Sequence, residues 1–253
     1  MKAEGKRKGR TISFVNQKGG VGKSTTCFNV GAALAEDGFK VLLVDMDPQA
    51  DCSTMFGYEL QNEDLTIYEV MHGEDIKKAI KTAGGLSMIL ADDALHVADF
   101  DFARKERTVL KKALSPVKAN YDFILIDCPP ALGVLTLNAL AASDEVIIPV
   151  QAQYLPLKGV SRLRETIEEA RQNINKGLQI GGVVLTFYDE RRKLDTEVRE
   201  SIEEAFGGKV FKTKISKNIK LAEAPSYKKS IFEYSPRSKG ASQYKELAAE
   251  ISK

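Results

Sequence analysis

Short runs of consecutive apolar residues recur along the chain. Five of them stand out: TISFV (11–15), VLLVD (41–45), FILID (123–127), VIIPV (146–150) and GVVLTF (182–187). A strand that is buried on both faces of a sheet has this pattern. LSMIL (86–90) is a candidate sixth strand within residues 51–110, where the pattern of apolar and polar residues is otherwise mixed.

The segments between these runs are long enough for crossover helices. One of them carries apolar residues at spacings of three and four after Pro156, namely Leu157, Val160, Leu163, Ile167, Ala170 and Ile174. Such spacing, with proline at the start, is typical of a helix with one buried face. The alternation of strands and helices predicts an α/β fold: a single doubly wound, mainly parallel sheet with helices on both faces.

Polar residues lie at or just past the ends of the predicted strands. They are Asn16, Asp45, Asp47, Asp127 and Gln151. Open α/β sheets bind ligands beyond the carboxyl ends of their strands. These five residues are therefore candidates for a ligand site.

Length and composition favour one large domain. A chain of 253 residues with 43% hydrophobic content suits one α/β domain better than two small ones. We expect this domain to span residues 11–253, after a basic, flexible leader at residues 1–10. The net charge of only +2 argues against general binding of polyanions by the whole molecule, so local clusters matter more.

The cysteines and the apolar runs indicate the compartment. Cys27, Cys52 and Cys128 are odd in number and lack metal-ligand spacing, which favours reduced thiols in the cytoplasm. The N-terminus has no apolar signal core, and the apolar runs are only as long as strands. We therefore expect neither secretion nor a membrane-spanning segment.

A glycine-rich stretch after the first predicted strand carries the strongest chemical signal. NQKGGVGKSTT (16–26) nearly matches the phosphate-binding loop G-x-x-x-x-G-K-[ST], but Gln17 replaces the first glycine and a second lysine, Lys18, follows it. Glycines allow successive N–H groups to point at phosphate oxygens, and the following helix adds its partial positive charge. Lys23 would hold the β and γ phosphates, and the Ser24 hydroxyl would bind Mg²⁺. A glycine-rich turn without a ligand is the weaker interpretation.

Three acids at strand ends are candidates for the rest of this site. Asp127 ends the strand FILID and would bind Mg²⁺ directly or through water; its alternative role is that of a helix cap or turn acid. Asp45 and Asp47 could each accept a hydrogen bond from a water that attacks the γ-phosphate. We favour Asp47, because Asp45 still belongs to its strand.

Two basic clusters are candidates for a DNA surface. Residues 209–229 contain seven lysines against one acid, Glu223. The group Arg191, Arg192 and Lys193 follows the fifth predicted strand and could extend this surface. The alternative is a solvated lysine-rich face. The basic leader could make a secondary contact with DNA or with a partner, although a mobile solvated tail is the simpler interpretation.

Four stretches together resemble a known family. KGGVGKSTT, VLLVDMDPQ, FILIDCPP and LAEAPSYKKSIFEYSPRSKGASQY, in this order and over nearly the whole chain, are similar to the ParA/Soj chromosome and plasmid partition ATPases. These belong to the deviant Walker A group of P-loop ATPases.

The resemblance implies roles for individual residues. Lys18 matches the signature lysine that reaches across a dimer interface to the ATP of the other subunit; Lys23 matches the loop lysine and Asp47 the acid that supports hydrolysis. Ser24 and Asp127 match the Mg²⁺ site. The implied nucleotide-binding residues are Lys18, Gly19, Gly20, Val21, Gly22, Lys23, Ser24, Thr25 and, near the adenine, Pro225.

The resemblance also implies cofactors and partners. They are ATP and Mg²⁺, a homodimer that forms when ATP is bound, double-stranded DNA bound without sequence preference, and a ParB-like protein that stimulates hydrolysis. The implied location is cytoplasmic, in association with the nucleoid. Arg191, Lys217 and Lys220 are the implied DNA contacts, although arginine is usual at the last two positions. Lys228 replaces a typical glycine, which puts the shape of its loop in question.

Three other functions share the nucleotide site. A MinD-like membrane-associated positioning ATPase would need an amphipathic anchor, whereas the final predicted helix (240–252) has only a modest apolar stripe of core type. A nitrogenase-reductase type would need two cysteine ligands per subunit for a shared iron–sulfur cluster, and Cys128 has no plausible second ligand. A metabolic enzyme that phosphorylates a small carboxylate would leave the lysine cluster without a purpose.

Overall fold

The computed structural model describes residues 9–102, 106–152 and 157–253. Most of the predicted leader (1–10) lies outside the described residues, as does Pro156. The same holds for the side chains of Leu157, Val160 and Leu163, although their backbone is helical as predicted.

In the described part of the chain, one sheet of seven strands forms the centre of the fold, in the order β3-β4-β2-β5-β1-β6-β7. The strands are β1 (Arg10–Phe14), β2 (Val41–Asp45), β3 (Ile80–Ala83), β4 (Leu86–Ile89), β5 (Phe123–Asp127), β6 (Glu145–Gln151) and β7 (Gln179–Thr186). All neighbouring strands are parallel except β3, which runs antiparallel to β4. The predicted mainly parallel sheet is confirmed.

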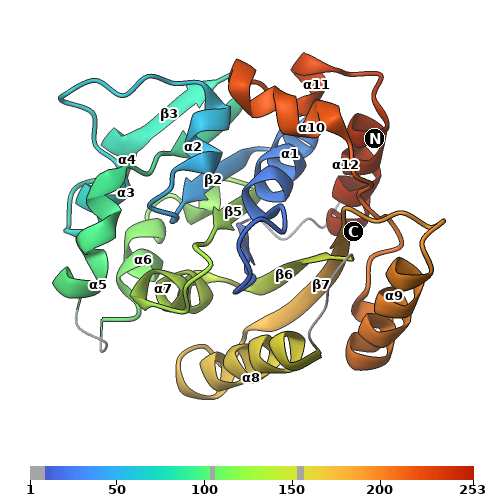
Figure 1. Ribbon diagram of the computed structural model, residues 1–253. Helices are drawn as coiled ribbons and strands as arrows, with labels where there is room; N and C mark the ends of the chain where they lie inside the picture. Colours follow the sequence, from blue (N-terminus) through green and yellow to red (C-terminus); the bar gives the residue numbers. More distant parts are fainter. Residues whose placement is uncertain (1–8, 103–105, 153–156) are drawn as a thin grey trace.

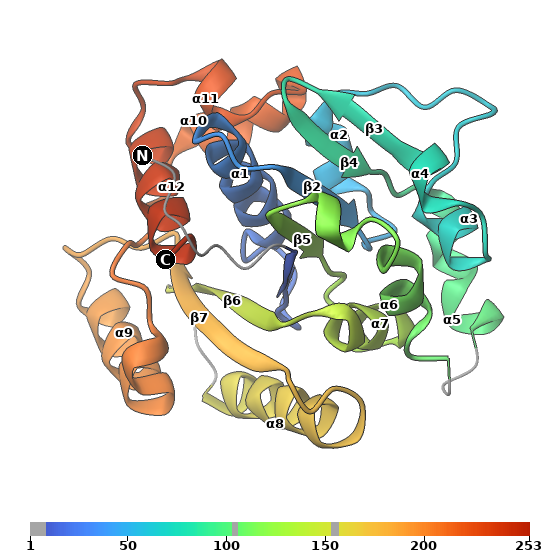
Figure 2. The same cartoon turned by 180° about the vertical axis from the view of Figure 1, so that it is seen from behind.

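Helices cover both faces of the sheet (Figures 1 and 2). The α-helices are α1 (Lys23–Glu36), α2 (Asp51–Phe56), α3 (Ile67–Met71), α4 (Ile76–Ala79), α5 (Ala98–Asp101), α6 (Val109–Leu114), α7 (Val134–Ala142), α8 (Leu157–Asn173), α9 (Lys193–Phe206), α10 (Ile219–Glu223), α11 (Ile231–Tyr234) and α12 (Lys239–Ile251). The 3₁₀ turns are η1 (Asp93–Val97), η2 (Lys118–Asn120), η3 (Gly207–Lys209) and η4 (Ala224–Tyr227).

The consecutive apolar runs are explained by two cores, one on each face. Within β2, Leu42 and Val44 pack into a core with residues of α3, α6, α7, α8 and α9. Val41 and Leu43 point the other way, into a core with residues of α1, α2, α11 and α12. Because successive strand residues face opposite sides, a strand with helices on both sides needs apolar residues at every position.

The first helix lies very close to the sheet. A Cβ atom built on Gly31 of α1 would come within 2.7 Å of the Leu43 side chain on β2, so a larger residue would force this side chain or the helix to shift. Helix α1 also packs against α12 through the second core. These contacts fix the start of α1, where the glycine-rich loop enters.

Some predicted boundaries differ from the structure. The first run lies one residue earlier, at β1, and the fifth begins earlier, because β7 includes the polar Gln179 at its exposed start. The candidate strand LSMIL is confirmed as β4. Strand β3 was not predicted; it lies at the sheet edge and is partly exposed, so it needs no apolar run. Among the described residues, no helix is both long and apolar enough to cross a membrane.

Candidate nucleotide site

The glycine-rich loop connects β1 to α1 at the carboxyl edge of the sheet. In the strand register, Asp127 of β5 lies level with Phe14 of β1 on one side and with Asp45 of β2 on the other. The parallel order therefore brings together a loop and two acids that are far apart in sequence.

Helix α1 begins without the usual cap. Its N-cap is Gly22, at φ 84°, and neither a side-chain cap nor an acidic residue in the first turn satisfies or neutralises the helix start. The positive φ is the left-handed conformation that favours glycine. The exposed N–H groups and the helix dipole are thus available to an anion, which is the requirement for phosphate binding.

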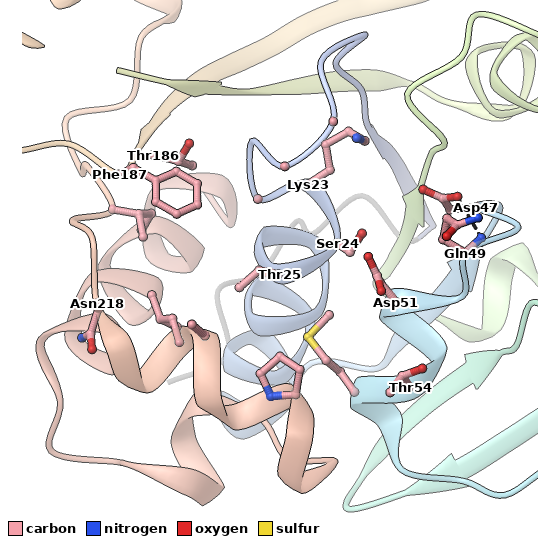
Figure 3. A pocket seen from close by; sticks show the side chains of 18 of the residues that line it. Lys23, Ser24, Thr25, Asp47, Gln49, Asp51, Thr54, Thr186, Phe187 and Asn218 are labelled. Carbon is pink, nitrogen blue, oxygen red and sulfur yellow. Dashed lines mark hydrogen bonds between the residues drawn. The ribbon is translucent and has the colours of Figure 1, made fainter. Parts of the chain in front are cut away.

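A cavity of about 500 Å³ opens beside this loop (Figure 3). Its polar part is lined by Lys23, Ser24 and, from the segment after β2, Asp47, Gln49 and Asp51. The other side is formed mainly by residues from β7 and the C-terminal third of the chain, including Thr186, Phe187, Ile215, Asn218, Leu221, Pro225 and Tyr244. A charged end for phosphates and a more apolar end for a base suit a nucleotide.

Of the predicted nucleotide-binding residues, most line this cavity. They are Gly19, Gly20, Gly22, Lys23, Ser24, Thr25 and Pro225. Val21 is instead buried, and its carbonyl accepts a hydrogen bond from the Thr186 hydroxyl, 2.8 Å away. Lys23 is 6% exposed, so its charge lies in a largely enclosed site where it would act strongly on a phosphate.

Lys18 points elsewhere. It is not among the described residues that line the cavity, and its Nζ donates a hydrogen bond to Oε1 of Gln151 at 3.0 Å. Asn16 accepts a bond from the Lys18 backbone N–H at 3.0 Å and donates one to the Pro149 carbonyl at 2.6 Å. The loop start is thus attached to the end of β6, which places the Lys18 ammonium away from the nucleotide cavity of its own chain.

Asp127 has the most unusual environment of the three acids. It is fully buried, and neither carboxylate oxygen has a hydrogen-bond partner among the described residues. Burial, followed by the charge of Asp45, holds the pKa of Asp127 well above its usual range; Ser24 and Lys23 oppose this shift without making a bond of normal geometry. Unpaired carboxylate oxygens beside a hydroxyl suit a hard divalent cation, so Asp127 and Ser24 fit Mg²⁺.

Asp45 is occupied by other donors. Its carboxylate accepts bonds from the Ser53 backbone at 2.8 Å, the Ser53 hydroxyl at 2.7 Å and the Asp47 backbone at 3.0 Å. Burial raises the pKa of Asp45 to about 7, although these donors oppose the shift. Asp45 therefore holds the start of α2 in place, whereas Asp47, 6% exposed, lines the cavity and accepts a bond from the Gln49 backbone at 3.0 Å.

The sequence reasoning missed several cavity residues. Gln49, Asp51 and Thr54 follow the acids after β2, and Phe187 follows β7, so the position just past a strand end was the signal that could have found them. Asn218 lies within the lysine-rich region, and the charge pattern of that region does not identify it.

Among the described residues other than glycine, left-handed backbone occurs at Ala50, Phe187 and Lys228, each at φ 53°, and of these Phe187 lines the nucleotide cavity. Lys228 thus keeps the conformation that glycine would adopt most easily, at a cost of about 1 kcal/mol. An ion pair of 2.7 Å with Glu59 holds its side chain. The replacement of glycine therefore does not unwind this loop.

The two basic clusters form one surface. Residues Tyr188 and Ser216 are bridged in parallel, and the Tyr188 N–H donates to the Ile215 carbonyl at 3.0 Å. A cleft of about 430 Å³ lies between the two segments; we call it the basic cleft, and its cations are Arg191, Lys212, Lys214, Lys217 and Lys239. Asp189, Glu190 and Glu246 are its acids.

Two of the predicted DNA contacts are paired with acids. Arg191 makes a two-bond contact with Asp189, with both distances 2.9 Å. Lys220 does not line the basic cleft; it pairs with Glu223 at 2.9 Å, and its ammonium lies 5.7 Å from the centre of the Tyr234 ring.

The three cysteines belong to the protein interior. All three are buried with free thiols, and burial raises the pKa of Cys27 to about 11. Over the described parts of the chain, no group of three or more His, Cys, Asp or Glu residues could hold a metal ion. Buried, protonated thiols of this kind behave as small apolar side chains.

Comparison with known proteins decides the family. A family model described as an AAA domain matches residues 9–180. The chain is 45% identical over 251 residues to the sporulation initiation inhibitor protein Soj of Bacillus subtilis, covering 96% of this chain and 98% of that protein. It is 45% identical over 248 residues to the chromosome-partitioning ATPase Soj of Treponema pallidum, with 96% and 97% covered. For the chromosome partitioning protein ParA of Caulobacter vibrioides, the values are 41% over 249 residues, with 96% and 93% covered. The chain belongs to the ParA/Soj family of chromosome-partitioning ATPases.

Solved structures agree with the ParA/Soj fold and cofactors. A crystal structure described as cobyrinic acid a,c-diamide synthase from Mycobacterium smegmatis, with bound ATP analogue and magnesium, is 32% identical, with a TM-score of 0.83 and 95% and 93% of the two chains covered. A plasmid partition protein from Borrelia burgdorferi is 25% identical, with a TM-score of 0.74 and 96% and 97% covered. The predicted P-loop ATPase, with ATP and Mg²⁺ as cofactors, is confirmed at the level of the family.

Proposed function

We propose that the chain is a partition ATPase whose ATP-bound homodimer binds DNA without sequence preference. The observation that carries this proposal is the direction of Lys18, whose ammonium lies outside the nucleotide cavity of its own chain. A lysine of the phosphate loop that does not serve its own nucleotide is available to the nucleotide of a second chain.

Within one chain, the roles follow from position. The N–H groups at the start of α1 and the enclosed Lys23 ammonium hold the phosphates. Asp47, at the rim of the polar end, accepts a hydrogen bond from the attacking water and orients it. Ser24 and Asp127 would hold Mg²⁺, which would supply positive charge beside the phosphates.

The charge of Lys18 would make association depend on the nucleotide. A cation that reaches the γ-phosphate of the other chain binds an ATP-loaded partner more strongly than an ADP-loaded one. Association can shift only by this difference in affinity. Hydrolysis would then weaken the dimer, and a ParB-like partner that orders the site would set the time of release.

The basic cleft is the proposed DNA surface, with Arg191 and Lys217 in it and Lys220 beside it. Ser216 lines both the basic cleft and the nucleotide cavity, so the two sites meet at the segment after η3. This proximity gives a path by which nucleotide state could affect DNA binding. With lysine in place of arginine at 217 and 220, contacts to phosphate lose the planar two-bond geometry. Binding to DNA would place the protein in the cytoplasm, on the nucleoid.

The described residues do not favour a membrane anchor in the last helix. Tyr244, Leu247, Ala248 and Ile251 of α12 are buried in the core that includes α1. A helix that binds a membrane surface needs these apolar side chains exposed. The MinD-like alternative would therefore require some other segment.

A metabolic function is the second candidate, because the relative from M. smegmatis is described as a synthase. A synthase of this kind would consume ATP in proportion to a small-molecule acceptor and not to DNA. ATP turnover measured with DNA, and separately with cobyrinic acid and a nitrogen donor such as ammonia or glutamine, would distinguish the two functions.

The decisive experiment combines sedimentation with DNA binding. With Mg²⁺ and ATP or AMPPNP, we expect a dimer that shifts DNA of arbitrary sequence, and with ADP a monomer that does not. Lys18→Ala should still bind ATP but lose the dimer, with Lys40→Ala, a lysine outside the cavity, as control. DNA binding that is independent of nucleotide would refute the switch, and a normal Lys18→Ala dimer would refute the contact between chains.

A further inference from the structure

The contact between Lys18 and Gln151 has a consequence for association. Gln151 is the last residue of β6 and lies opposite Thr186 of β7, so its backbone is fixed by the sheet. Its side-chain oxygen lies 3.0 Å from the Lys18 ammonium. Lys18 must give up this position if it is to reach a second chain.

The acceptor is a neutral amide, not a carboxylate. A hydrogen bond between exposed groups contributes little, because water replaces it easily. Such a contact can orient a lysine and still release it. A carboxylate at the same place would form an ion pair and would hold the lysine more strongly.

The loop start is fixed by Asn16, two residues before Lys18. Asn16 attaches the loop to the Pro149 carbonyl and accepts a bond from the Lys18 backbone, so the side chain leaves the loop in a defined direction, toward Gln151.

We propose that Gln151 is a positioning residue that docks Lys18 within its own chain and thereby sets how readily ATP-bound chains associate. The inference rests on the proposed ATP-dependent dimer. Formation of each dimer requires two lysines to leave Gln151. The factor by which docking reduces the share of chains with a released lysine therefore enters the dimer dissociation constant as its square.

The test uses two substitutions with opposite expected effects. Gln151→Glu should strengthen docking about two- to fivefold per chain and, because the weak wild-type contact is formed about half of the time, weaken the dimer about 2- to 9-fold. Gln151→Ala removes the acceptor and should tighten the dimer by about fourfold. The dimer dissociation constant is measured by analytical ultracentrifugation of the full chain in saturating Mg²⁺ and AMPPNP. Gln172→Glu, the same chemical change on the exposed face of α8, is the matched control.

A second measurement reports docking in the monomer. In nucleotide-free protein, the rate of reductive methylation at Lys18, relative to exposed Lys209, should rise in Gln151→Ala and fall in Gln151→Glu. ADP binding by each variant verifies that the phosphate loop is intact. High salt should reduce the effect of Gln151→Glu on the dimer, because the new ion pair is screened.

The outcomes separate the two proposals. Opposite shifts of the two variants, in both measurements, would support docking. Weaker dimers in both variants would indicate a structural role and overturn it, as would unchanged dimers and unchanged Lys18 reactivity. If the wild-type chain stays monomeric in AMPPNP, both the proposed ATP-dependent dimer and the role of Gln151 in its association fail. If the wild-type chain forms a dimer and the Gln151 variants behave as it does, only the docking proposal is overturned.

Discussion

At the residue scale, three acids at neighbouring strand ends have different environments and therefore different chemistry. Asp45 accepts hydrogen bonds from three donors, Asp127 is buried without one, and Asp47 lines the nucleotide cavity. Sequence position alone identified all three as candidates. Asp47 was favoured over Asp45 because Asp45 belongs to its strand, and in the structure the Asp45 carboxylate is bound by Ser53. The hydrogen bonds themselves could not be predicted, because Ser53 lies on another element.

Asp47→Ala is expected to slow ATP hydrolysis without preventing ATP binding. The carboxylate that orients water contributes to the transition state more than to the bound nucleotide, and such groups typically contribute about 10²–10⁴-fold. Phosphate release under single-turnover conditions is the measurement. Asp37→Ala, at the exposed end of α1, is the control. Unchanged turnover would assign the role to another acid.

Asp127→Asn is expected to stabilise the nucleotide-free protein and to weaken Mg²⁺-dependent nucleotide binding. A buried, unsatisfied carboxylate costs about 1–3 kcal/mol, and a neutral amide costs less to bury. The raised pKa of Asp127 leads to the same conclusion, because the folded protein holds this proton more tightly than the unfolded chain does. The contribution of Asp127 to the free energy of unfolding therefore becomes less unfavourable as the pH falls.

Thermal unfolding would test both effects of Asp127→Asn. A domain of this size shifts by about 2–4 °C per kcal/mol, so Tm should rise by several degrees without nucleotide, and the further rise with Mg²⁺ and AMPPNP should shrink. A lower Tm in the nucleotide-free state would contradict the account of Asp127 as an uncompensated charge.

At the scale of elements, the sequence identified what depends on local pattern. The central strands were found because burial on both faces leaves a continuous apolar run, and the start of α1 was found because its glycines precede Lys23 and Ser24. Strand β3 was missed because an edge strand needs no such run. The sequence also could not predict that the two basic clusters lie together, because this depends on the bridge between Tyr188 and Ser216.

Substitutions in and beside the basic cleft should reduce the salt dependence of DNA binding. We expect Arg191→Ala, Lys217→Ala and Lys220→Ala each to lower the slope of log affinity against log salt by about one, the value for one phosphate contact. Titration by fluorescence anisotropy at several salt concentrations is the measurement. Lys245→Ala, whose lysine pairs with Glu36 on α1, is the control. Equal slopes for all variants would place the DNA surface elsewhere.

At the scale of the whole molecule, the nucleotide cavity draws on distant parts of the chain. It is lined by residues from the loop after β1, the segment after β2, the end of β7 and the turn at η4. The sequence predicted the edge of the sheet at which these parts meet, by the rule for parallel strands. For the C-terminal third, only Pro225 was predicted to lie at the cavity, and this prediction came from the family resemblance. No pattern of strands in that region indicates its place.

A ligand that bridges these parts should stabilise the whole fold. At one hundred times its dissociation constant, AMPPNP with Mg²⁺ should add about 2.7 kcal/mol, or about 5–10 °C in Tm. Differential scanning fluorimetry is the measurement. Lys23→Ala, which removes the enclosed ammonium, should abolish most of this shift. A full shift in Lys23→Ala would show that binding does not use the phosphate loop.

The two edges of the sheet limit how copies of the molecule can meet. At one edge, short β3 carries Lys81, paired with Asp64, and turns back through glycines at 84 and 85. At the other, β7 is bridged by Val210 and continues into the bridge at Tyr188. Both edges are thus partly protected against an incoming strand, one by its short length and its charge and the other by the bridges beside it. Contacts between copies of this chain are therefore expected to form through side-chain surfaces and not by extension of one another's sheet.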